Sequence, residues 1–319
     1  MRKNPNGTPT TMTLFVTHKD TDDYCRAGEF YRDGHEIAVS GFDINNTMAS
    51  LKRGDWEKII MYQKKNLTKE AKIDEDDLKG MRAPDLKTGA DEQFKAMLHM
   101  SNKTKYKDCA WKPYDSSIVL GEKMAWRNTP PLWPYTMNYN VFEQIRPQHN
   151  HPVQCYDGVW EIPVRRFYDN YSTAHEFIDD WRATENEEMQ YYTLANNFWS
   201  HYSTNRAPFL INARTDWFKT VPTAEKSLKR FIDVVLAHKL KDVYVVSMDL
   251  MLDWVKNPKT LTEITELDFK RTTKRRGAKC NIAKLESTGR LNGAMMLVIE
   301  GTVLFVLLVV LIAKDKAEG

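Results

Sequence analysis

The strongest strand pattern of the chain lies in Asp33-Gly34-His35-Glu36-Ile37-Ala38-Val39-Ser40-Gly41-Phe42-Asp43-Ile44. Residues 36–39 form a short, largely apolar run of the kind that a buried parallel strand shows, and Gly34 interrupts the pattern before it. In folds that alternate strands and helices, the residues just past such a strand form the active-site rim. The sequence therefore predicts a buried strand at 36–39 that is followed by functional residues at 40–44.

Strand and helix patterns alternate along most of the chain. Short apolar runs predict further strands at 14–17, 78–81 and 243–246. Amphipathic spacing predicts helices at 22–32, 55–65, 91–100, 223–235 and 250–255. The segment 130–164 is rich in Pro, Trp and Tyr, lacks periodicity and is predicted to be loop. This alternation predicts an α/β fold with a parallel sheet.

Composition restricts the class of protein only loosely. A hydrophobic content of 42% in 319 residues is enough to bury the core of a barrel-sized domain with an appendage. The net charge of +3 argues neither for nor against nucleic acid, and no nucleic-acid partner is expected. The first seven residues are polar and resemble no signal peptide.

The cysteines and the glycosylation sequons bear on the compartment. No Cys-x-x-Cys spacing occurs, so a zinc ribbon or thioredoxin-like site is not expected, and both disulfides and free thiols stay open for Cys25, Cys109, Cys155 and Cys280. Asn-x-Ser/Thr sequons, which indicate lumenal exposure, occur at Asn6, Asn45, Asn66, Asn102 and Asn170.

The C-terminal part changes character. Residues 263–292 are polar and basic, which is typical of a solvated stalk. Residues 293–313 then form a run of 21 residues with the single charge Glu300, long enough to cross a bilayer. The sequence predicts a transmembrane helix there, followed by a short tail at 314–319.

Several segments resemble the chitin deacetylases of the polysaccharide deacetylase (NodB-like) family. Gly34-His35-Glu36-Ile37-Ala38-Val39 resembles the strand that leads into their His-x-x-x-His metal motif, and Gly80-Met81-Arg82-Ala83-Pro84 resembles their Arg-containing motif. Similar segments follow at 133–136, 156–163, 215–219 and 242–258. The resemblance covers Arg2 to about Leu261 and implies a distorted, incomplete β/α barrel over 1–262. Its first strand would fall before residue 1, which would leave an unpaired edge beside 13–17.

The resemblance also implies a reaction and a set of catalytic positions. The family removes acetyl groups from N-acetylglucosamine polymers with a zinc-bound water, held by an Asp-His-His ligand set. In this chain the two histidine positions read Ser40 and Ile44, the position after the Arg motif reads Asp85, and Arg214 replaces the general-acid histidine. No intact catalytic site and no zinc are therefore expected. A metal site rebuilt on His149 and His151 stays an alternative.

Substrate-binding residues are also implied by the resemblance. Trp160, Trp217 and Tyr135, with Trp133, lie on segments that line the family's sugar cleft, although packing in the core is an alternative. Arg82 and Arg214 would face the space left by the metal, where they bind an anion or pair with Asp85.

These features predict a membrane-anchored, single-pass, catalytically inactive chitin-deacetylase-like protein that binds chitin or a related aminoglycan. An active deacetylase whose N-terminal motif lies outside this sequence is one alternative, and a tail-anchored adhesion or scaffold protein is another. The basic residues before the predicted span favour a cytosolic domain. The sequons and the resemblance favour an extracellular or lumenal one, which is the orientation we expect.

Overall fold

The buried strand predicted at 36–39 is strand β2 (Glu36–Val39), and all four of its residues are buried. It pairs in parallel with β1 (Thr13–Val16) on one side and β3 (Gly80–Met81) on the other. The parallel run continues through β4 (Tyr114–Asp115) and β6 (Trp160–Glu161). The predicted α/β class with a parallel sheet is confirmed, and the arrangement is consistent with a distorted β/α barrel.

Other strands extend the sheet at both ends. This computed structural model describes residues 2–18, 21, 24–41, 50–101, 113–121, 129–141, 147, 149–181, 186–239, 241–271, 275–280 and 304–312. Antiparallel β5 (Tyr135–Thr136) follows β6 at one end. At the other, β9 (Phe209–Arg214) and β10 (Val243–Val246) both pair with β11 (Leu304–Ile312). A separate hairpin joins β7 (Phe167–Tyr168) to β8 (Ala174–His175).

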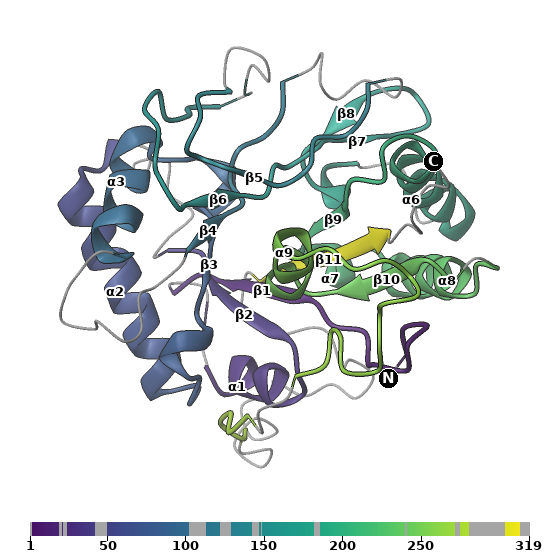
Figure 1. Cartoon of the computed structure of the whole chain (residues 1–319), viewed down its shortest axis with the longest axis horizontal. Helices are drawn as coiled ribbons and strands as arrows, with labels where there is room; N and C mark the ends of the chain where they lie inside the picture. Colours follow the sequence, from purple (N-terminus) through teal and green to yellow (C-terminus); the bar gives the residue numbers. More distant parts are fainter. Residues whose placement is uncertain are drawn as a thin grey trace.

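Helices cover the outside of the strands. Figure 1 shows α2 (Arg53–Lys69) packed beside α3 (Ala90–Ser101) on one side, with α6 (Glu187–Tyr202) beside α8 (Ala224–Leu236) on the opposite side. Helices α1 (Cys25–Arg32) and α7 (Thr215–Thr220) complete the outer layer. Short 3-10 turns lie at Glu75–Asp77, Pro84–Leu86 and Ile178–Asp180.

Successive side chains of a strand point to opposite faces of the sheet, so the buried strands contribute to an apolar layer on each face. Leu14 and Val16 of β1 belong to the cluster that also contains Trp56 and Phe231 of the outer helices. Phe15 of β1 belongs instead to the cluster inside the curved sheet. The inner cluster also contains Met248, Met251 and Leu252 of α9 (Met248–Lys256), so this helix closes one end of the sheet.

The closed end is the one at which the parallel strands begin. The backbone N–H of Met248 donates to Thr13 Oγ1 at 2.8 Å, and that of Asp249 donates to Glu36 Oε2 at 3.0 Å. Arg271 forms ion pairs with both oxygens of Asp249 at 2.5 and 2.6 Å. Burial and the neighbouring Asp249 raise the pKa of Glu36 to about 8. The pKa of Glu36 therefore lies above neutral pH, and its carboxyl accepts further hydrogen bonds from the hydroxyls of Thr13 and Tyr114.

Part of the predicted stalk is held on the barrel. Arg275 is 8% exposed and donates to the carbonyl of His35 at 2.6 Å, and the N–H of Ala278 donates to the carbonyl of Ala71 at 2.8 Å. Cys280 forms a disulfide with Cys25. Residues 275–280 are therefore not a solvated linker, because they pack against α1 and the start of β2.

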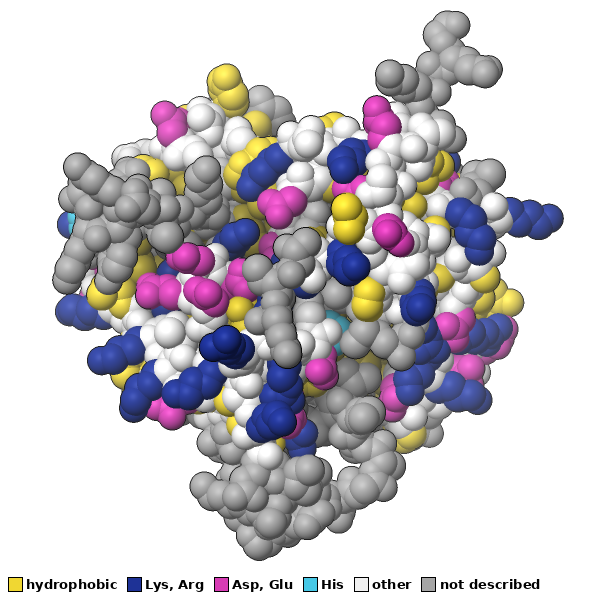
Figure 2. All heavy atoms as spheres, turned by 60° about the horizontal axis from the view of Figure 1, so that its bottom comes forward, with side chains coloured by type: hydrophobic (Ala, Val, Ile, Leu, Met, Phe, Trp, Pro, Cys, Tyr) yellow, Lys and Arg dark blue, Asp and Glu magenta, His cyan; other side chains and the backbone are white. Residues whose placement is uncertain are grey.

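On the face in Figure 2, basic and acidic side chains of the described residues are interspersed.

The prediction of a transmembrane helix over 293–313 is wrong where the structure describes it. Residues 304–312 form strand β11, and no helix among the described residues is both long and apolar enough to span a bilayer. The remaining residues of the predicted span lie outside the described ranges. The edge of β1 that was expected to be unpaired is paired with β11.

We expect the disulfide to contribute strongly to stability, because it closes a loop of 255 residues. Replacing Cys25 and Cys280 together by Ala should lower the free energy of unfolding by about 2–5 kcal/mol in urea titrations. Cys155→Ala is the control, since Cys155 is an exposed free thiol. Equal unfolding midpoints for the double variant and this control would contradict the expectation.

Candidate functional site at the carboxyl ends of the strands

A buried arginine lies at the centre of the barrel. Arg82 follows β3 and is completely buried, and each of its three side-chain nitrogens donates a hydrogen bond. Its Nε donates to the Ser116 carbonyl at 2.7 Å, Nη2 donates to Ser116 Oγ at 2.7 Å, and Nη1 donates to Asn212 Oδ1 at 2.6 Å. The guanidinium also lies 4.7 Å from the centre of the Phe15 ring. Arg82, predicted to bind substrate, instead ties β3 to β9 and to the residue after β4.

The charge of Arg82 is balanced by a buried pair of carboxyl groups that the sequence analysis missed. Asp115 accepts hydrogen bonds from Gln93 at 2.7 Å and from the Ser117 hydroxyl and N–H at 3.0 and 2.8 Å. Burial raises the pKa of Asp115 to about 6, while burial and the nearby Asp115 raise the pKa of Glu161 well above its usual range. Asp115 is thus the ionised member, and Glu161 retains its proton.

The second arginine, Arg214, is the last residue of β9 and lies at the mouth of the barrel. Its Nη1 lies 2.7 Å from both Asp179 Oδ2 and Asp180 Oδ1, and its Nη2 lies 3.1 Å from Asp85 Oδ1. The pairing with Asp85, one of the predicted alternatives, is therefore present. The guanidinium also stacks on Phe177, at 3.7 Å from the ring centre.

Every carboxylate oxygen of these three aspartates has a partner. The remaining oxygen of Asp85 lies 3.0 Å from Lys87 Nζ. That of Asp179 accepts a hydrogen bond from the backbone N–H of Arg214 at 3.0 Å, and that of Asp180 accepts one from the backbone N–H of Phe177 at 3.1 Å. Burial lowers the pKa of Arg214, but Asp179 and Asp180 outweigh it and hold this pKa above its usual value. Arg214 therefore stays charged, and it cannot alternate between donating and accepting a proton.

The position of the first histidine ligand carries a buried serine. Ser40 follows β2 directly, its N–H donates to the Val16 carbonyl at 3.0 Å, and its hydroxyl has no hydrogen-bond partner among the described residues. Ile44, at the second ligand position, lies outside the described residues. Neither a neutral serine nor an arginine is a zinc ligand, and the mouth carboxylates already bind Arg214. The residues described here do not fit a catalytic zinc.

The alternative histidine site is not assembled either. His149 Nε2 lies 2.7 Å from Glu176 Oε1, and His151 Nδ1 lies 3.2 Å from the carbonyl of His149. The structure's described ranges contain no group of three or more His, Cys, Asp or Glu side chains arranged to hold a metal ion.

The predicted aromatic residues are not gathered at the mouth. Trp217 is 3% exposed and packs in the outer core, and the Tyr135 hydroxyl is buried. Trp160 is half-buried at the start of β6, with Lys256 Nζ 5.4 Å from its ring centre. The Trp133 and Trp254 rings stack at 6.4 Å. Because Trp254 and Lys256 belong to α9, these rings lie at the amino end of the strands, opposite Arg214.

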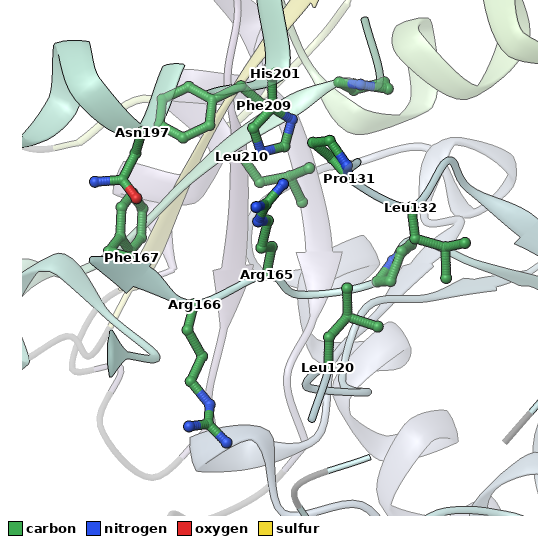
Figure 3. A pocket seen from close by; sticks show the side chains of 12 residues that line it. Leu120, Pro131, Leu132, Arg165, Arg166, Phe167, Asn197, His201, Phe209 and Leu210 are labelled. Atoms are coloured by element: carbon green, nitrogen blue, oxygen red, sulfur yellow. The ribbon is translucent and has the colours of Figure 1, made fainter. Parts of the chain in front are cut away.

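A small pocket lies apart from all predicted site residues. Figure 3 shows it between the start of β9, α6 and the segment before β7, with Arg165 and His201 on its wall. Burial lowers the pKa of Arg165 to about 10 and that of His201 to about 3, so His201 is neutral. The Arg165 Nη2 donates to the carbonyl of Thr129 at 3.1 Å, which indicates a structural role.

Comparison with known proteins identifies two relatives with related names. No protein-family model matches the chain. The chain is 30% identical over 275 residues to chitin deacetylase 1 of Bombyx mori and 27% identical over 264 residues to chitin deacetylase 8 of the same organism. The matches cover 82% and 81% of this chain but 47% and 64% of those proteins. The chain thus spans about half to two thirds of the relatives it matches, and the predicted resemblance is confirmed.

We expect the two buried acids to respond differently to substitution. Asp115→Asn removes the counter-charge of Arg82 and should lower the free energy of unfolding by about 3 kcal/mol or more. Glu161→Gln replaces a protonated acid by a neutral group of similar size and should cost no more than about 1 kcal/mol.

The pH dependence provides the control. Because the folded-state pKa of Glu161 is raised, its contribution to stability is complete below the unfolded pKa of about 4.3 and declines as pH rises through the folded value. Wild-type protein should therefore lose stability relative to Glu161→Gln as pH increases. Parallel pH profiles in urea unfolding would show that Glu161 is ionised instead.

Proposed function

Because the chain belongs to the chitin deacetylase-like proteins of the polysaccharide deacetylase family, we propose that it is a non-catalytic member that binds polymers of N-acetylglucosamine without removing their acetyl groups. The observation that carries this proposal is the ion-pair network of Arg214. A permanent cation, held by three aspartates, occupies the mouth where the family resemblance expects a proton-donating histidine.

Amide hydrolysis at this mouth would need groups that the described residues there do not supply. A metal-bound water requires neutral histidine or carboxylate ligands with a free coordination position. Ser40 is buried and uncharged, and the carboxylates of Asp85, Asp179 and Asp180 are engaged by Arg214, Lys87 and backbone N–H groups. Release of an amine also requires an acid that gives up its proton near neutral pH, which an arginine does not do.

The partly buried tryptophans at the amino end of the strands support the binding part of the proposal. Trp133, Trp160 and Trp254 are aromatic side chains of the kind that pack on the C–H faces of sugar rings, and Trp133 and Trp254 stack on each other. Lys256 beside Trp160 adds hydrogen-bond donors for hydroxyl or acetamido oxygens. This surface is separate from the mouth, so binding there does not depend on an intact catalytic centre.

The compartment in this proposal is extracellular or lumenal. The disulfide between Cys25 and Cys280 supports it, because structural disulfides persist in oxidising compartments and are rare in the cytosol. A chitin-like polymer would be encountered in the same compartment.

The catalytic part is tested by incubating the purified chain with chitin oligomers and measuring free acetate. We expect no acetate above the protein-free blank, with or without added Zn²⁺ or Co²⁺, while the chain still sediments with chitin. Acetate release that a chelator abolishes would refute the proposal in favour of an active deacetylase. Absence of both release and binding would favour a scaffold protein.

The binding surface is tested by single substitutions. Trp160→Ala should weaken chitin binding by about tenfold or more, since truncating a central aromatic contact typically costs about 2 kcal/mol. Trp199→Ala is the matched control, because Trp199 is 40% exposed on α6, remote from Trp160 and Lys256 in the fold. Equal losses in the two variants, measured by depletion binding to chitin, would reject this surface.

A further inference from the structure

Strand β11 has three strand neighbours. On one side it pairs with β1 through 304–307 and then with β10 through 309–312. On the other side it pairs with β9 through 305–310. β1 and β10 therefore follow each other along one edge of β11, and β9 lies along its other edge.

The direction of β11 differs from that of its neighbours. It is antiparallel to β1, β9 and β10, whereas β1, β2, β3, β4 and β6 run parallel to one another. β11 is also the longest strand among the described residues, with nine residues against four in β1 and six in β9. A single extended segment from the far end of the chain thus joins strands that have no ladder with one another.

We propose that the channel between β1 and β10 on one side and β9 on the other is a strand-acceptor site, whose ligand is an extended apolar segment and whose occupant is residues 304–312 of the same chain. Backbone hydrogen bonds from both sides hold such a segment, as in β-strand addition. This proposal is independent of the proposed sugar binding.

Burial and sequence both fit this occupant. The facing residues of β1 and β10 are all buried, so a vacant channel would leave a row of backbone N–H and C=O groups unpaired within an apolar surrounding. Residues 304–312 read Leu-Phe-Val-Leu-Leu-Val-Val-Leu-Ile and contain none of the Gly, Pro, Asp or Asn residues that disfavour strands.

Anchoring of the preceding segment makes capture within one chain favourable. Cys280 is bonded to Cys25 of α1, and Arg275 contacts His35 at the start of β2. Leu304 follows Cys280 by 24 positions (304 minus 280), which keeps the apolar segment close to β1 at a high effective concentration. The acceptor site thereby competes with a bilayer for this segment, because residues in the channel cannot at the same time form a membrane-spanning helix.

The test introduces cysteine pairs into the full chain, in which Cys109 and Cys155 have been changed to Ser. Leu14 and Val306 are direct partners in the β1–β11 register, whereas Val310 pairs with Val245 and Phe209. We expect Leu14→Cys with Val306→Cys to form an internal disulfide in most chains on mild oxidation. Leu14→Cys with Val310→Cys is the out-of-register control and should form little or none, as read by non-reduced peptide mapping.

The oxidation is done with and without phosphatidylcholine vesicles. An internal disulfide for the in-register pair alone supports the proposal. Three outcomes would overturn it. Disulfides only between two chains would place the segment in another chain, and equal yields for the two pairs would show that it has no fixed register. Loss of the in-register disulfide when vesicles are added would place the segment in the bilayer.

Hydrogen exchange provides a second readout without new cysteines. Leu308→Pro removes the N–H at a position that pairs with Ile211, whereas Leu308→Ala keeps it. We expect the amides of β1 and β9 to lose protection in the proline variant and to keep it in the alanine variant. Unchanged protection in both would overturn the proposal, and if the proline variant does not fold, the cysteine pairs decide.

Discussion

The buried guanidinium of Arg82 is the constraint on which the rest of the barrel depends. A charged group without contact to water must have each donor satisfied and its charge balanced, since either failure costs several kcal/mol. For Arg82, oxygens of Ser116 and Asn212 accept one hydrogen bond from each side-chain nitrogen, and the carboxylate of Asp115 supplies the counter-charge. Arg82 therefore determines which polar groups β4 and β9 turn inward.

Arg82 and Arg214 connect different parts of the barrel. Arg82 links strands below the mouth, and Arg214 joins the 3-10 turn at 178–180 to the turn at 84–86 through their aspartates. In the turn at 84–86, Asp85 has a left-handed backbone with φ of 52°, which aspartate tolerates better than most residues. Residues at positions where the family resemblance predicts catalytic groups thus hold the loops of this chain together.

Much of the fold follows from local patterns, because short apolar runs and amphipathic spacing report directly on β2, β10, α2 and α8. The pairing of Arg214 with Asp85 was also among the predicted alternatives. Hydropathy alone, however, does not distinguish a membrane span from a buried strand, since an apolar run such as residues 304–312 is compatible with both. Likewise, the complete burial of Arg82 and the protonation of Glu161 depend on neighbours far away in the sequence, and four cysteines permit several pairings.

The disulfide between Cys25 and Cys280 has a consequence for how the chain is degraded. Its ring contains most of the domain, including the exposed loops around Tyr139 and Tyr171. A protease that cuts one of these loops once opens the ring but leaves both pieces joined by a covalent bond. In an oxidising compartment such a nicked molecule retains its mass and its buried core, and the two fragments separate only after reduction.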